Sequence, residues 1–131
     1  MDVRPGATGT ATMTVTPDRT AESMGNPGAK VFATPWVIAL LENAAAAVLR
    51  PHLAPGQGTV GTMVDMRHLA ATPLGMTVRA TATLLETDGR RFLFAVEAWD
   101  DRDKIAEGRH ERYVVTDMAK FLERAIKKGE G

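Results

Sequence analysis

The chain has 131 residues, and its 16 basic and 16 acidic side chains give a formal net charge of zero. This balance provides no electrostatic reason to expect nucleic acid or an anionic membrane as a partner. Cysteine is absent, which excludes disulfides, thiolate zinc sites and a cysteine nucleophile. The length and the 44% hydrophobic content predict one globular domain over residues 1–131.

Signals for export and membrane insertion are also missing. Residues 1–10 carry no apolar core of the signal-peptide type. No uncharged apolar run approaches the roughly 20 residues that cross a bilayer. We therefore expect a soluble cytoplasmic protein.

Alternating apolar and polar residues predict five strands. These cover residues 10–16, 59–69, 76–87, 90–100 and 104–116. In the second of them we expect Thr62, Val64, Met66 and His68 to share one face. Residues 17–30 have the composition of a surface loop, and residues 117–128 predict a short amphipathic C-terminal helix.

A strongly apolar helix is predicted between the first and second strands. Thr34 is a favoured N-cap residue and Pro35 suits the first helical position. The helix should end near Arg50, because Pro51 cannot continue it. Apolar residues surround the helical wheel, so we expect this helix to be buried on most sides.

Glu42 is the only charged residue in this apolar segment, and Asn43 follows it directly. A buried carboxylate is costly unless it has partners or a function. Such groups cluster at functional sites, which makes Glu42 a candidate catalytic residue. The alternative is that Glu42 and Asn43 occupy a narrow strip of the helix that faces solvent.

The predicted order β-α-β-β-β-β-α indicates an α+β fold in which a curved antiparallel sheet of about five strands surrounds one long helix. Four local motifs add to this pattern. They are Phe-Ala-Thr eight residues before Glu42, Gly-Thr at residues 61–62, His-x-Ala-Ala-x-Pro-x-Gly at residues 68–75, and Gly-x-His-Glu-Arg at residues 108–112. Together they resemble the fluoroacetyl-CoA thioesterase family of hotdog-fold enzymes over roughly residues 31–122.

This resemblance implies an acyl-CoA thioesterase that acts on a short acyl group and needs no cofactor, since coenzyme A belongs to the substrate. By motif position, the family's catalytic threonine, glutamate and histidine fall on Thr34, Glu42 and His68. The glycine whose backbone helps to bind the thioester falls on Gly61. We expect Asn43 and Arg112 to contact substrate as well, Arg112 as one of several basic side chains that suit coenzyme A phosphates.

The sequence differs from the family pattern at two places. Pro35 follows the catalytic threonine where a smaller residue is expected, and no aromatic residue precedes Phe32. The family's fluoroacetate-selective lid is aromatic. We therefore expect thioester hydrolysis without the fluoroacetyl specificity.

The residues themselves leave several roles open. Thr34 polarises the thioester, positions water, attacks directly or only caps the helix, and Glu42 acts as general base or as nucleophile. Over eight helical residues the rise is about 12 Å, so Thr34 and Glu42 should not bond each other directly. His68 orients Glu42, protonates the leaving thiolate or is a core residue, whereas we interpret His110 as structural or supporting.

Gly61 and His68 are seven residues apart, which places them on opposite faces of a regular strand. Bringing both to one site requires a bulge in the strand or a site shared between two subunits. Hotdog proteins usually form dimers with sites at the interface, so we expect a homodimer or a dimer of dimers. The three scattered histidines predict no metal site.

Two other functions fit the same sequence. The protein could bind an acyl thioester or a small apolar ligand without turnover, which the changes at Pro35 and in the N-terminal loop would motivate. It could also hydrate an enoyl thioester with Glu42 and His68 as the proton-transfer pair.

Overall fold

The computed structural model describes residues 1–130, in which five strands and two α-helices form the main elements. The strands are β1 (Thr8–Thr14), β2 (Gly58–His68), β3 (Thr77–Thr87), β4 (Arg91–Trp99) and β5 (Lys104–Val115). The helices are α1 (Thr34–Leu49) and α2 (Met118–Gly129). Single turns of 3-10 helix occur at η1 (Pro17–Arg19), η2 (Glu22–Met24) and η3 (Arg50–His52), the first two within the predicted loop.

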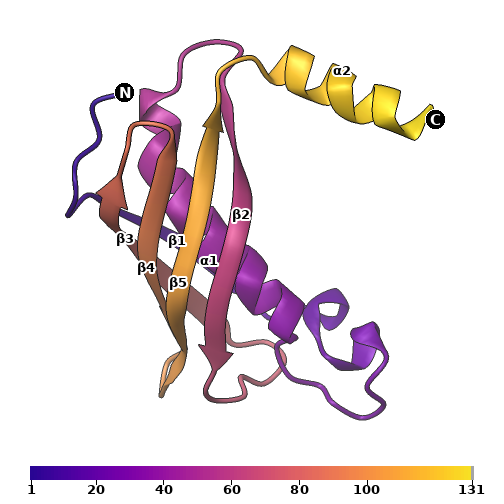
Figure 1. The fold of residues 1–131 in the computed structure, drawn as a ribbon. Helices are drawn as coiled ribbons and strands as arrows, with labels where there is room; N and C mark the ends of the chain where they lie inside the picture. The colour runs from indigo at the N-terminus through magenta and orange to yellow at the C-terminus, as the bar shows by residue number, and fades with distance from the viewer. Residues whose placement is uncertain (131) are drawn as a thin grey trace.

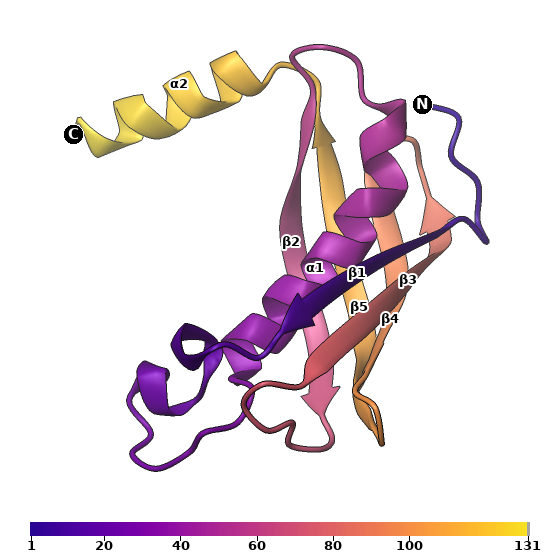
Figure 2. The same cartoon turned by 180° about the vertical axis from the view of Figure 1, so that it is seen from behind.

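The five strands form one antiparallel sheet in the order β1-β3-β4-β5-β2, so β1 and β2 are its edges. The sheet curves around α1, which lies along its concave face (Figures 1 and 2). This arrangement confirms the predicted α+β hotdog fold. Because β2 pairs only with β5 among the described residues, its other edge keeps unpaired backbone groups.

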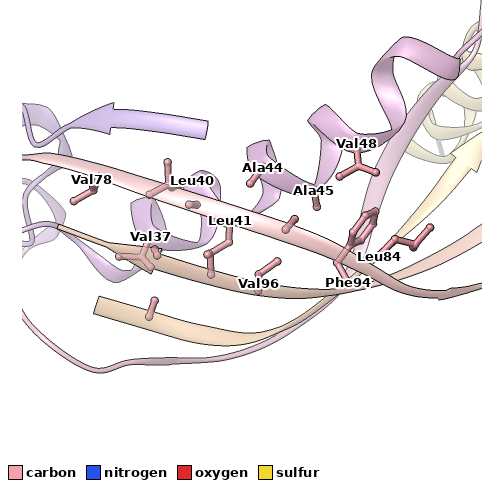
Figure 3. Close-up of a cluster of buried hydrophobic side chains, with 14 of the residues drawn as sticks. Val37, Leu40, Leu41, Ala44, Ala45, Val48, Val78, Leu84, Phe94 and Val96 are labelled. Carbon is pink, nitrogen blue, oxygen red and sulfur yellow. The ribbon is translucent and has the colours of Figure 1, made fainter. Parts of the chain in front are cut away.

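The core lies between α1 and the concave face of the sheet. Val37, Leu40 and Leu41 of α1 are completely buried, and Figure 3 shows the side chains of this helix directed toward Val96 and Phe94 of β4. Each large apolar side chain buried in this way contributes about 1.5–3 kcal/mol. Burial of α1 therefore holds the helix rigidly against the sheet and determines which strip of it remains accessible.

The start of α1 differs from the prediction by one residue. Ala33 is the N-cap and Thr34 is the first helical residue, with no side-chain capping bond. Pro35 occupies the first turn, where its missing N–H costs no intrahelical hydrogen bond. The Thr34 hydroxyl is consequently not used for capping and remains available for another partner.

A bulge in β2 changes the predicted pattern of faces. Gly61 lies opposite Arg112 and Met63 lies opposite Glu111, so Thr62 is an extra residue in the strand. The Thr62 hydroxyl donates to the Glu111 carboxylate at 2.7 Å instead of joining the face that carries His68. Our assignment of Thr62 to that face was therefore wrong. The bulge places Gly61 and His68 on the same face. A bulge was one of the two explanations, beside a site shared between subunits, by which the sequence allowed both residues to reach one site.

The C-terminal helix α2 extends away from the sheet on the side of β2 (Figures 1 and 2). Its N-cap is Asp117, whose carboxylate accepts from the backbone N–H of Lys120 at 3.1 Å. The helix is amphipathic as predicted, yet Phe121, Leu122 and Ile126 are 46%, 56% and 55% exposed. Over residues 1–130, neither helix has the length and apolar character needed to cross a membrane.

Candidate functional site

One strip of α1 remains partly exposed to solvent and carries Glu42, the lone carboxylate of this helix. The Glu42 side chain is 36% exposed, and Asn43 beside it is exposed with no side-chain hydrogen bond to the described residues. The solvent-facing strip considered from sequence therefore exists. Glu42 is nevertheless not a simple surface residue, because its carboxylate contacts a charged side chain from the sheet.

That partner is Arg112 of β5, which is 7% exposed. Its Nη1 donates to Oε2 of Glu42 at 3.2 Å. Its Nε donates to the Thr59 hydroxyl at 3.0 Å and its Nη2 to the Thr59 carbonyl at 3.2 Å, so β2 holds the other side of the guanidinium. Burial lowers the pKa of Arg112 while Glu42 opposes that shift. A buried guanidinium with these partners belongs to the Glu42 site, and its contact with substrate stays a prediction.

Gly61 leaves the space in which the Glu42 carboxylate lies. A Cβ atom at position 61 would be 2.5 Å from Oε2 of Glu42 and 3.1 Å from Cε1 of His110. Contacts below 3.0 Å force something to move. The motif glycine predicted from sequence thus lies directly beside the candidate catalytic carboxylate.

Thr34 and His68 form a second pair at the N-terminal end of α1. The Thr34 Oγ1 and His68 Nδ1 atoms are 2.9 Å apart. Burial lowers the pKa of His68, against a smaller opposing effect from the backbone at Ala70, so its neutral imidazole is favoured. The other ring nitrogen, Nε2, is buried and has no hydrogen-bond partner among residues 1–130. If Nδ1 accepts the Thr34 proton, Nε2 carries a hydrogen that it can donate to a ligand.

The three predicted catalytic residues thus fall into two groups in a single chain. Thr34 bonds His68, whereas Glu42 bonds Arg112. The eight-residue separation along α1 corresponds to about 12 Å, in agreement with our expectation that Thr34 and Glu42 do not bond directly.

His110 lies beside the Glu42 site and contacts Arg112. Our sequence reasoning missed this contact. His110 is completely buried, its Nδ1 is 2.8 Å from the Met63 carbonyl oxygen, and its Nε2 is 3.2 Å from Nη1 of Arg112. Its Nε2 is also 4.0 Å from Oε2 of Glu42. The sequence does contain a signal for this contact, because residues 110 and 112 are two apart on one strand and therefore share a face.

Comparison with known proteins bears directly on this constellation. The model of the fluoroacetyl-CoA-specific thioesterase family matches residues 15–118. The chain belongs to this family. The fluoroacetyl-CoA thioesterase of Streptantibioticus cattleyicolor is 44% identical over 86 residues, which cover 66% of this chain and 62% of that relative's length.

Solved structures give the same assignment over a longer span. The crystal structure of a fluoroacetyl-CoA thioesterase superposes with a TM-score of 0.89 at 36% identity and covers 98% of each chain. A thioesterase superfamily member from Thermus thermophilus superposes with a TM-score of 0.85 at 32% identity, covering 98% of this chain and 96% of its own. The fluoroacetyl-CoA thioesterase has also been solved as threonine variants, one with fluoroacetate and one with acetyl-CoA.

Proposed function

We propose that this protein hydrolyses a short-chain acyl-CoA thioester to the free acid and coenzyme A. The observation that carries the proposal is the Glu42 carboxylate, which lies half-exposed on an otherwise apolar helix and is held by buried Arg112 beside Gly61. Membership of a thioesterase family supports the same reaction. No cofactor is required, because the thioester itself is the activated group.

Glu42 is the residue that we assign to the bond-forming step. An ionised carboxylate can remove a proton from water that attacks the thioester carbonyl, or it can attack that carbonyl and form an anhydride. Arg112 holds the carboxylate in one place, which is the main structural requirement of both routes. Label in the Glu42 side chain after single-turnover hydrolysis in ¹⁸O-water would identify the anhydride route with water attacking the glutamyl carbonyl, because in the general-base route the labelled oxygen goes to the product acid.

We assign the Thr34–His68 pair to stabilising the negative charge on the thioester carbonyl oxygen and to protonating the leaving thiolate. Thr34 lies in the first turn of α1, where unpaired backbone N–H groups and the positive end of the helix dipole favour a developing negative charge. His68 contacts the Thr34 hydroxyl and has an unpaired Nε2 within the described chain. A hydrogen on this nitrogen would be suited to the departing thiolate once a small shift of the ring uncovers Nε2, which is buried in the single chain.

We further propose that a homodimer completes the site. β2 is an edge strand, and antiparallel pairing of two copies along β2 brings the His68 end of one copy to the Gly58 end of the other. The partly exposed strip of α1 around Glu42 would then be covered. The thioester would lie between Glu42 of one copy and the Thr34–His68 pair of the other.

For the acyl group, we propose a short chain without selectivity for fluoroacetate. No aromatic residue precedes Phe32, and Phe32 itself is completely buried in the core. The N-terminal segment therefore offers no aromatic side chain for an acyl-selective lid. A narrow preference for fluoroacetyl-CoA over acetyl-CoA would contradict this part of the proposal.

The decisive experiment measures thiol release from a panel of acyl-CoAs of graded length, including acetyl-CoA and fluoroacetyl-CoA. We expect turnover of short members and its loss, by at least about 100-fold, in Glu42→Gln. Glu123→Gln is the matched control, since this carboxylate is exposed on α2 and pairs with Lys127. No thiol release from any member would contradict the proposal. Loss of an enoyl absorbance without thiol release would indicate hydration instead.

Mixed dimers test the shared site. Thr34→Ala and Glu42→Gln chains, each of which we expect to be inactive alone, are unfolded together and refolded as a mixture. If each site takes residues from both copies, one intact site forms in every heterodimer, so roughly a quarter of wild-type activity should return. No recovery in a refolded dimer would show that each site uses a single chain.

A further inference from the structure

His110 is a buried titratable group for which the proposed chemistry has no role. It lies on β5 with no exposed surface, beneath Gly61 and behind the Arg112 guanidinium. A substrate in the Glu42 site cannot touch it. Any effect of His110 on the reaction therefore has to act through a neighbour.

The hydrogen bonds of His110 determine which of its nitrogens carries the hydrogen. The Met63 carbonyl oxygen, 2.8 Å from Nδ1, can only accept, so Nδ1 must donate. Arg112 Nη1, 3.2 Å from Nε2, can only donate, so Nε2 must accept. Both bonds are satisfied only by the neutral imidazole with its hydrogen on Nδ1.

Arg112 has acceptors on each nitrogen of its guanidinium. Nε and Nη2 are bound by Thr59, and Nη1 is shared between Glu42 and His110. Nη1 has two hydrogens, which match these two acceptors. Without the His110 acceptor, one buried N–H of the group that holds Glu42 would lose its partner, and the guanidinium could rotate.

From this geometry we infer that His110 is a positioning residue, whose neutral Nε2 fixes the Arg112 guanidinium and thereby holds the Glu42 carboxylate in its working place. This inference rests on the proposed function for its kinetic consequence. The contacts on which it is based belong to this chain and do not depend on the identity of the acyl group.

The surroundings of His110 favour the neutral form that this role needs. Burial lowers its pKa; the Met63 carbonyl opposes that shift, Arg112 adds to it, and Glu42 and Glu111 oppose it. Protonation would remove the acceptor and place a second positive charge beside Arg112. We therefore expect Arg112 to lose its fixed orientation when the pH falls low enough to protonate His110.

Two amide variants separate the two hydrogen bonds of His110. In His110→Gln the side-chain oxygen can replace Nε2 as the acceptor for Arg112. In His110→Asn the amide reaches the Met63 carbonyl but falls short of Arg112. We expect kcat to fall by roughly 10- to 100-fold in the asparagine variant, the range for a misplaced catalytic group, and by less than about 3-fold in the glutamine variant. His52→Asn, an exposed histidine in η3, is the control for the substitution itself.

A merely structural role predicts a different result. Thermal melting would then fall with similar losses of kcat in both variants, and that outcome would overturn the inference. If the asparagine variant does not fold, the glutamine variant decides: a kcat loss of 10-fold or more in a normally folded protein would equally overturn it.

Nitrogen-15 NMR of the histidine rings gives a readout that needs no turnover. We expect the wild-type His110 ring to be neutral at pH 7 with its hydrogen on Nδ1, and the Arg112 Nε–H to remain protected from exchange in His110→Gln but not in His110→Asn. A hydrogen on Nε2 would overturn the inference. An inactive wild-type protein with the expected NMR signals would instead contradict the proposed function alone.

Discussion

Gly61→Ala adds one methyl group at the point where the sheet approaches the Glu42 carboxylate. The new Cβ would lie 2.5 Å from Oε2 of Glu42, whereas ordinary contacts begin at 3.4 Å. The carboxylate must therefore move by about 0.9 Å, and a misplacement of about 1 Å can cost roughly 100-fold in rate. We expect kcat to fall by about 10- to 100-fold.

The fold should tolerate this change. Gly61 is not among the glycines with positive φ, so alanine can adopt its backbone conformation. The atom that has to move farthest is at the end of a flexible side chain and not in the backbone, and the buried His110 ring, 3.1 Å from the new Cβ, has to shift by only about 0.3 Å. The free energy of unfolding should therefore fall by no more than about 1 kcal/mol, the contribution of one partly exposed ion pair, as the 3.2 Å contact between Glu42 and Arg112 lengthens.

The assay compares steady-state thiol release with melting temperature for Gly61→Ala and for a control variant, Gly129→Ala. Gly129 is at the end of α2, and a Cβ there would meet no heavy atom of residues 1–130 within 4 Å beyond its own stretch of helix. The Gly129 variant should retain wild-type kcat. Unchanged kcat in Gly61→Ala would refute the reasoning, because the position of Glu42 would then not limit the reaction.

Three further predictions concern stability. Burial lowers the pKa values of His68 and His110 in the folded chain below the ordinary histidine value of about 6.5. As the pH is lowered from about 7.5 to about 5.5, the unfolded chain therefore binds more protons than the folded chain, and the urea midpoint should fall. An unchanged midpoint would contradict those shifts. Asp100→Ala removes a buried carboxylate that accepts from the Thr72 hydroxyl at 2.8 Å and should cost about 1–3 kcal/mol in urea unfolding without reducing kcat. Leu122→Ser, on the exposed face of α2, should change the free energy of unfolding by less than about 0.5 kcal/mol, and a larger loss would show that this face is covered in solution.

The arrangement of strands and helices was accessible from local sequence. Period-two alternation located β2 to β5 within one or two residues at each end, and Pro51 marked the end of α1. The apolar wheel around residues 34–49 required a sheet that curves around it. These features depend on periodicity and on backbone restrictions, which act between near neighbours in the chain.

Local patterns also singled out Thr34, Glu42, Gly61 and His68 as candidates. Glu42 stood out because one charge in an apolar segment is costly, and the others came from motifs that match a known family. What the sequence could not show was their grouping. Thr34 appeared to be an N-cap, because the partner that uses its hydroxyl is His68, 34 residues further along the chain.

The tertiary structure alone determined the pairings that define the site. Arg112 meets Glu42 across 70 residues of sequence, and the bulge at Thr62 decides that Gly61 faces the same side as His68. A bulge changes which face every following residue occupies, yet it leaves no clear mark in the alternation. The sequence by itself therefore determined the elements and the residues with chemical potential, whereas long-range strand register decided which of these residues meet.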